Sequence, residues 1–281
     1  EYVLLGKITF FLVISLLLLC WTTVILRLWV RLRITRSAGW DDACMVASLL
    51  LFTSYSAFIL VITMRGSAEH IAAANILLET LTFVQLAEVF YILTTTMLKI
   101  SLGLFFLRVL TKKWQARIFY SILAISAVYG FIYVFITIFQ CGDPVKLADG
   151  LLNSKNCLPS KFILTTGYLY GIINVIADWT FVLVPIVVLL DSDMDRRSKI
   201  SVSIVMALGA VGSISSILRM VYLKGLLFGA TLSPEAIKAT IWATAEPGTG
   251  IIAASIAILR PLCRKIATDV KGKISEYGTS K

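Results

Sequence analysis

The chain has 281 residues, of which 58% are hydrophobic and 15% are charged, and its formal net charge is +10. An average soluble domain carries about 25% charged residues, so this composition excludes an ordinary soluble protein and indicates an integral membrane protein. Its mean hydropathy of +0.89 agrees. The basic residues flank apolar segments and do not form a patch with interleaved aromatic residues, which argues against nucleic-acid binding. The first partner that the sequence predicts is therefore the lipid bilayer.

Seven apolar segments are long enough to cross a bilayer, because about 20 helical residues span a hydrocarbon core of about 30 Å. They lie at residues 8–30, 42–64, 81–108, 118–140, 162–190, 200–223 and 235–259. The sequence thus predicts an all-α protein, an integral membrane seven-helix bundle. We expect a seven-transmembrane domain at residues 1–261 and a basic cytoplasmic tail at 262–281. The chain opens at Glu1 and not at a methionine, so a signal peptide or a soluble domain could precede it.

The loops differ in their content of Lys and Arg, which indicates the orientation in the membrane. The N-terminus and the second, fourth and sixth loops carry six basic residues: Lys7, Arg65, Lys146, Lys155, Lys161 and Lys224. The odd-numbered loops and the tail carry fifteen, among them Arg31, Arg33, Arg36, Lys112, Lys113, Arg117, Arg196, Arg197 and Lys199. Cytoplasmic loops hold the excess of basic residues, so the N-terminus is predicted outside and the C-terminus in the cytoplasm.

A polar stripe runs through the third segment. Glu88 and Lys99 are 11 positions apart, which at ~100° per residue brings them within ~20° of the same helix face and ~16 Å apart. Tyr91 and Thr95 lie along the same stripe. Since an ionisable group in the bilayer core is costly, other helices are expected to cover this face.

The second segment begins with two acids, Asp41 and Asp42, directly after Gly39. They could cap the helix, because carboxylates suit the positive end of the helix dipole. They could equally form an ion-pair latch with the basic residues of the first loop, Arg31, Arg33 and Arg36.

Further polar residues lie in the last three segments. Asn174 and Asp178 are four apart and share a face of the fifth, and Arg219 follows a run of small residues in the sixth. Glu246 lies near the middle of the seventh, directly before the residues Pro-Gly-Thr-Gly at 247–250. This sequence predicts a break in the helix, which a membrane tolerates only against protein or a water-filled cavity.

These residues fall into two predicted layers. The outer layer would form a ligand-binding pocket open to the outside and comprises Glu88, Tyr91, Arg219, Trp242 and Glu246. The inner layer would form a polar cluster of Asp41, Asp42, Lys99, Asn174 and Asp178. We expect Arg219 to pair with Glu88 or Glu246, and Lys99 to pair with Asp178. The alternative is that both layers are clamps between helices and bind no ligand.

Cys141 and Cys157 bracket the fourth loop, CGDPVKLADGLLNSKNC, which the charge distribution places outside, where disulfides persist. We predict a disulfide that stabilises the protein by about 3 kcal/mol. The alternative is a pair of free thiols.

Several motifs together resemble the fungal rhodopsin-like domain family, which includes relatives of CFEM receptors. They are GWDD after a basic loop, YILTTTMLKISLGLFFLRV, CGDP with a later Cys, NVIADWTFVLVP, ILRM and TAEPGTGIIAASIAILRPL. The resemblance implies a multi-pass plasma-membrane protein with seven helices, in some members a proposed sensor coupled to a cytoplasmic signalling partner. The chain has no CFEM-type cysteine cluster.

The residues predict neither a cofactor nor a metal. A retinal Schiff base needs a lysine in the middle of the last segment, which here has only Lys238 near its outer start. The only histidine, His70, lies in an external loop, which excludes a metal site of the His-cluster type.

The leading functional hypothesis is a receptor-like sensor of an extracellular or small lipophilic ligand that binds near Glu88, Arg219 and Glu246. The alternative is a membrane enzyme of fungal secondary metabolism, an isomerase or cyclase. In that case Glu88, Asp178 and Glu246 would supply acid–base groups. No sharper catalytic motif supports an enzyme, and no internal repeat supports a transporter.

Overall fold

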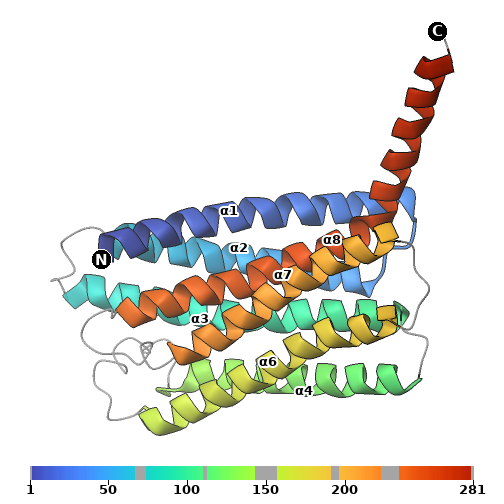
Figure 1. Cartoon of the computed structure of the whole chain (residues 1–281). Helices are drawn as coiled ribbons and strands as arrows, with labels where there is room; N and C mark the ends of the chain where they lie inside the picture. Colours follow the sequence, from blue (N-terminus) through green and yellow to red (C-terminus); the bar gives the residue numbers. More distant parts are fainter. Residues whose placement is uncertain are drawn as a thin grey trace.

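The computed structural model of the chain describes residues 2–66, 74–109, 113–142, 157–190, 196–222 and 234–279. These residues form seven α-helices in one bundle (Figure 1). The helices are α1 (Tyr2–Trp29), which a π-helical turn η1 (Val30–Ile34) continues, α2 (Trp40–Gly66), α3 (Ala74–Val109), α4 (Lys113–Phe139), α6 (Ser160–Leu190), α7 (Arg196–Val221) and α8 (Pro234–Thr279). The described residues contain no strand, and the all-α prediction is confirmed.

Six of these helices are long and apolar enough to cross a membrane. The crossing segments are Leu4–Ile34, Trp40–Met64, Thr80–Arg108, Lys113–Phe139, Ser160–Val184 and Pro234–Leu259. The remaining helix, α7, has 26 residues, and an apolar stretch within it covers Gly209–Val221. The helices coincide with the seven predicted segments, so the seven-helix membrane bundle is confirmed.

Large apolar side chains point away from the bundle. Phe11 is 70% exposed, Val221 65% and Phe135 61%. A water-soluble protein of this size rarely exposes so much apolar surface. In a bilayer these side chains contact acyl chains, which explains why the helices are apolar on both faces.

The two ends of the chain lie at opposite ends of the bundle (Figure 1). An odd number of helices in an up-and-down bundle places its two ends in this way. The last helix continues beyond its membrane-crossing part to Thr279, and Figure 1 shows its final turns projecting away from the other helices. The predicted tail thus starts as a continuation of α8.

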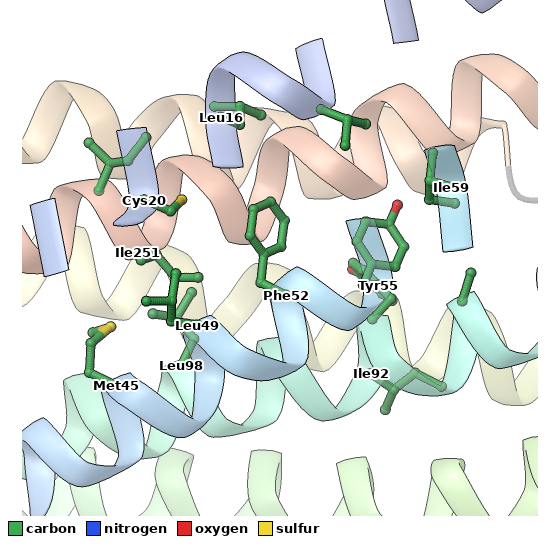
Figure 2. Packing of buried hydrophobic residues seen from close by; sticks show 14 of the residues in the cluster. Leu16, Cys20, Met45, Leu49, Phe52, Tyr55, Ile59, Ile92, Leu98 and Ile251 are labelled. Atoms are coloured by element: carbon green, nitrogen blue, oxygen red, sulfur yellow. The ribbon is translucent and has the colours of Figure 1, made fainter. Parts of the chain in front are cut away.

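The core lies where α8 meets α1, α2 and α3. Met45 and Phe52 of α2 and Ile251 of α8 are completely buried, and they belong to one hydrophobic cluster with Cys20 of α1 (Figure 2). A small residue at position 250 favours close approach of α8 to α3, because a Cβ added at Gly250 would lie 2.6 Å from Leu98 Cδ2, which would have to shift. This packing directs Glu246, one turn earlier on α8, toward the other helices.

The predicted break in the last helix is wrong, because α8 is helical throughout 234–279. Pro247 has no backbone N–H, so the Ala243 carbonyl one turn earlier loses its helical hydrogen bond, which transmembrane helices tolerate. In the same stretch, the Thr249 hydroxyl donates to the Ala245 carbonyl at 2.7 Å, and the Cys20 thiol donates to the Gly248 carbonyl at 3.4 Å. Pro247 and Gly248 are buried, so the segment serves helix packing.

Candidate functional site

Glu246 of α8 lies where four helices meet. Its side chain is 5% exposed, and its Oε2 accepts a hydrogen bond from the Tyr91 hydroxyl of α3 at 2.7 Å. Its Oε1 accepts a hydrogen bond from the Asn174 amide of α6. Arg219 of α7 places its Nε 3.8 Å from Glu246 Oε2. We call these four residues the central cluster.

Arg219 is buried but incompletely hydrogen-bonded. Its guanidinium lies 4.6 Å from the centre of the Tyr91 ring and 5.9 Å from that of Tyr170, so both rings contribute cation–π attraction. Its Nε has no hydrogen-bond partner within the described residues. An ion pair at 3.8 Å leaves this buried donor unsatisfied, so the central cluster retains capacity for a further acceptor.

Glu88 of α3 belongs to the same outer region but is not paired with Arg219 at ion-pair distance. Its Oε1 accepts a long hydrogen bond of 3.3 Å from the Tyr133 hydroxyl of α4. Its side chain is partly accessible. Of the two partners expected for Arg219, the structure selects Glu246.

The other residues predicted for the outer layer lie on α3 and α8. Tyr91 is buried and belongs to the central cluster. Trp242 is partly buried, one helical turn before Glu246. Within the described residues no hydrogen bond joins the Trp242 indole to this cluster. Tyr55 of α2 is also present, and its hydroxyl lies 2.9 Å from the Thr244 hydroxyl.

Lys99 and Asp178 form the predicted pair. The Lys99 ammonium, with its side chain 5% exposed, binds Asp178 Oδ1, and the Ser216 hydroxyl donates to Asp178 Oδ2 at 2.9 Å. This group links α3, α6 and α7. Both carboxylate oxygens have partners, which is what a buried ion pair requires.

Asn174 does not belong to the inner cluster, contrary to the prediction. It shares a face of α6 with Asp178, as expected for residues four apart. However, it lies one turn closer to the start of α6 and donates to Glu246. The shared face therefore spans both layers.

Asp41 and Asp42 act as latch and cap together. Asp41 Oδ2 lies 3.0 Å from Arg27 Nη2 and 3.2 Å from Arg31 Nη2, and Asp42 Oδ1 lies 2.8 Å from Arg27 Nε. Asp42 Oδ2 also accepts a hydrogen bond from the Gly39 backbone amide at 3.2 Å. The helix-cap interpretation and the ion-pair interpretation of these two acids are therefore both confirmed.

The main partner of these acids was not among the predicted residues. Arg27 is 1% exposed, and its Nη1 donates to the Ala254 carbonyl of α8 at 3.1 Å. Arg108 of α3 adds an ion pair of 3.4 Å to Asp41. Arg33 and Arg36 are exposed and make no ion pair with either acid. The latch therefore joins α1, α2, α3 and α8 and not only the first loop.

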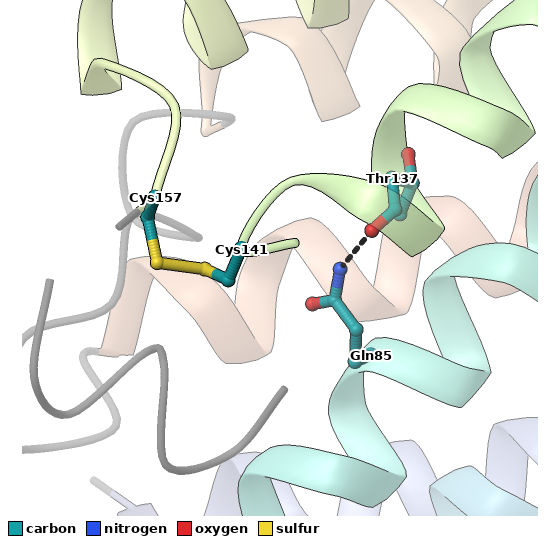
Figure 3. Close-up of a disulfide and its surroundings, with 4 residues drawn as sticks. All are labelled: Gln85, Thr137, Cys141 and Cys157. Atoms are coloured by element: carbon teal, nitrogen blue, oxygen red, sulfur yellow. Dashed lines mark hydrogen bonds between the residues drawn. A yellow bond between two sulfur atoms is a disulfide. The ribbon is translucent and has the colours of Figure 1, made fainter. Parts of the chain in front are cut away.

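The predicted disulfide between Cys141 and Cys157 is present (Figure 3). Close to it, the Gln85 amide of α3 donates to the Thr137 carbonyl of α4 at 3.1 Å. The loop between the cysteines, 143–156, and His70 lie outside the described residues. The disulfide connects the end of α4 to the start of α6.

An apolar groove of about 400 Å³ lies between α6 and α7. Its lining includes Tyr168, Ile172, Ile217, Met220 and Val221. Ile172 and Val221 are exposed, so the groove faces the bilayer. The residues that line the groove include none of the central cluster.

Comparison with family models matches the fungal rhodopsin domain over residues 26–265, which is most of the chain. No curated protein and no solved structure matches the sequence. The bundle of membrane helices agrees with the family match, and both support a receptor-like membrane protein. The chain therefore belongs to the fungal rhodopsin domain family.

Proposed function

We propose that the protein is a plasma-membrane sensor in which a lipophilic or extracellular ligand acts on the central cluster. The observation that best supports this proposal is the buried pair of Arg219 and Glu246. Arg219 Nε lies 3.8 Å from Glu246 Oε2 and has no hydrogen-bond acceptor within the described residues. A ligand with an acceptor group could satisfy Arg219 only by altering contacts that four helices share. Such a ligand would bind two packings of the bundle with different affinities, as a conformational response requires.

The proposed site comprises the predicted outer residues Glu88, Tyr91, Arg219, Trp242 and Glu246. Asn174 supports it by orienting Glu246. The ion pairs of Lys99 and of Arg27 would hold the inner half of the bundle in register while the outer half responds. In this arrangement the ion pairs between helices and the ligand site would act together.

The proposed orientation has the N-terminus outside and the residues 262–281 in the cytoplasm, after a seven-transmembrane domain at 1–261. The excess of Lys and Arg on the odd-numbered loops and the tail supports it. The basic tail, or the basic loops, would contact the cytoplasmic signalling partner. A glycosylation acceptor inserted at the N-terminus should be modified, and one inserted after Thr279 should not.

An acid–base enzyme is the less favoured alternative. Both oxygens of Glu246 accept hydrogen bonds within the protein, and both oxygens of Asp178 have partners. A general acid or base must reach the substrate atom within about 2.6–3.2 Å. Two of the three candidate carboxylates, Asp178 and Glu246, are fully engaged by the protein and are poorly placed for this role.

Complementation of a deletion strain tests the sensor function. The strain would receive the wild-type gene, Arg219→Gln, Glu246→Gln or the control Ile214→Ala, whose side chain is 49% exposed on α7. We expect strains with Arg219→Gln or Glu246→Gln to show the transcript profile of the deletion strain, and the strain with Ile214→Ala to show the wild-type profile. If both Arg219→Gln and Glu246→Gln gave the wild-type profile at equal amounts of inserted protein, the proposal would be refuted.

A further inference from the structure

The ion-pair group at the start of α2 contains more base than acid. Three guanidiniums, those of Arg27, Arg31 and Arg108, lie 3.0, 3.2 and 3.4 Å from the Asp41 carboxylate. Among the described residues, Asp42 is the only other carboxylate with which any of them pairs. Three guanidiniums therefore share two carboxylates, which leaves an excess of one positive charge.

The two carboxylates have no oxygen left for a further donor. Asp41 uses one oxygen for Arg27 and Arg31 and the other for Arg108. Asp42 uses one for Arg27 and the other for the backbone amide that caps the helix. Arg31 Nε is buried and has no hydrogen-bond partner within the described residues. Both acids are themselves buried, so the surface that this group presents is basic.

Arg108, at the end of α3, is the accessible member of the group. Its side chain is 49% exposed. Its Nη1 donates to the Ser37 carbonyl at 3.3 Å and lies 3.4 Å from Asp41 Oδ1, and both contacts are longer than the ~2.7–2.9 Å of a strong charge-assisted hydrogen bond. A Cβ added at Gly39 would overlap with the Arg108 guanidinium, so this group lies against the backbone of the first loop. The guanidinium is thus positioned by the loop but free to bind an anion.

A second exposed arginine adjoins this position. Arg36 directly precedes Ser37, the residue whose carbonyl Arg108 contacts. Its φ of 46° is a left-handed conformation that favours glycine or asparagine. The turn alone does not explain an arginine here, and strained backbone of this kind is typical of functional positions. Arg36 and Arg108 therefore offer two guanidiniums on one exposed surface.

This surface lies at the level of the lipid headgroups. Three crossing segments have an end here, at Ile34, Trp40 and Arg108. Trp40 is 81% exposed and Leu32 is 59% exposed, and tryptophan is enriched at the boundary between membrane and water. A guanidinium binds a phosphate group with two parallel hydrogen bonds. The phosphate of a lipid would be the nearest anion at this depth.

We infer that Arg36 and Arg108 form a binding site for the phosphate of an anionic phospholipid, whose acyl chains would contact Trp40. The site goes beyond the sensor function, because it lies about 25 Å along α3 from Tyr91 by the helical rise. The proposed orientation would place it in the cytoplasmic leaflet, where anionic lipids are concentrated.

Thermal unfolding of the full chain in neutral detergent micelles tests the inference, with dioctanoyl phosphatidic acid as the probe. Dioctanoyl phosphatidylcholine has the same acyl chains but no net charge, and inorganic phosphate has no acyl chain. We expect only the phosphatidic acid to raise the melting temperature of the wild type with saturable dependence on concentration. Arg108→Gln should require at least about tenfold more of it, because charge-assisted hydrogen bonds are lost.

Two further variants separate a site from a general effect of charge. Arg36→Asn removes one charge and suits the left-handed backbone, so it should fold and should require several-fold more phosphatidic acid. Arg33→Gln removes an equal charge from an exposed arginine for which the described residues include no contact with Ser37 or Asp41. This control should change the required concentration by less than about twofold, because exposed charges are screened.

The inference would be overturned if the wild type did not respond to phosphatidic acid, or responded equally to phosphatidylcholine or inorganic phosphate. Equal effects of Arg33→Gln and Arg108→Gln, or an unchanged response in Arg36→Asn, would also overturn it. Binding of hexaglutamate through Arg108 without a response to phosphatidic acid would assign the surface to an acidic protein segment instead. None of these results bears on the complementation experiment, which changes Arg219 and Glu246.

Discussion

Arg27 Nε of α1 lies 2.8 Å from Asp42 Oδ1 of α2, and both side chains are at least 95% buried. The same guanidinium binds Asp41 and the Ala254 carbonyl of α8. A single residue thus supplies donors to two other helices, α2 and α8, near the C-terminal end of α1. A buried charge is tolerated here because it is fully paired.

Arg27→Gln should destabilise the protein by about 3–5 kcal/mol, because it leaves two buried carboxylates without their main partner. The measurement is unfolding of the purified chain in mixed micelles. Arg33→Gln removes an exposed arginine from η1, which follows α1 directly, and should change stability by less than about 0.5 kcal/mol. Equal stability of the two variants would show that the latch contributes nothing.

Lys99 and Asp178 should show strong coupling in a double-mutant cycle. Lys99→Met or Asp178→Leu alone leaves one buried charge and should cost about 3–5 kcal/mol, whereas the double variant should recover most of this loss. Unfolding free energies of the four proteins give the coupling energy. Simple additivity of the two single effects would exclude a buried ion pair.

Gly130 provides a test of helix packing between α4 and α3. A Cβ added there would lie 2.3 Å from Thr96 Oγ1, and the branched Thr96 side chain has little freedom to move. Gly130→Ala should therefore destabilise by about 1–3 kcal/mol. The control Gly6→Ala meets its nearest neighbour at 3.9 Å and should be neutral or slightly stabilising.

Cys141→Ser with Cys157→Ser should lower the unfolding free energy by about 3 kcal/mol in the chain-entropy model. The disulfide closes a loop with a sequence separation of 16. Reductant should destabilise the wild type to the same extent and leave the double variant unchanged. Cys44→Ser removes a free cysteine and should retain the wild-type sensitivity to reductant. Insensitivity of the wild type would contradict the disulfide.

Hydropathy predicted the seven helices, because roughly 20 apolar residues in water-free surroundings have no alternative to a helix. The Lys99–Asp178 pair followed from the cost of an isolated charge in the membrane. The disulfide followed from the position of both cysteines in one external loop. Each of these predictions depends on a local property of the sequence.

The contacts that the sequence predicted wrongly are those that depend on how the helices rotate and pack against one another. Asn174 and Asp178 share a face, but only the position of α8 decides that Glu246 takes Asn174. The Pro-Gly pair at 247–248 indicates a break in isolation, yet α8 continues through it and packs against α1, whose Cys20 thiol donates to the Gly248 carbonyl. Arg27 could have been found, because it is an arginine within an apolar segment, four residues before Arg31.

The most direct test of the central claim is thiol labelling of Ser255→Cys in native membranes, in a background without the other free cysteines. Ser255 of α8 is completely buried near the C-terminal end of its crossing segment. If Glu246 holds the four helices together, Glu246→Gln should increase the rate of labelling by a membrane-permeant maleimide at least about tenfold, which corresponds to about 1.4 kcal/mol. The control Glu235→Gln should leave the labelling rate unchanged. Equal rates in all three backgrounds would contradict the claim that the central cluster controls the packing of the bundle.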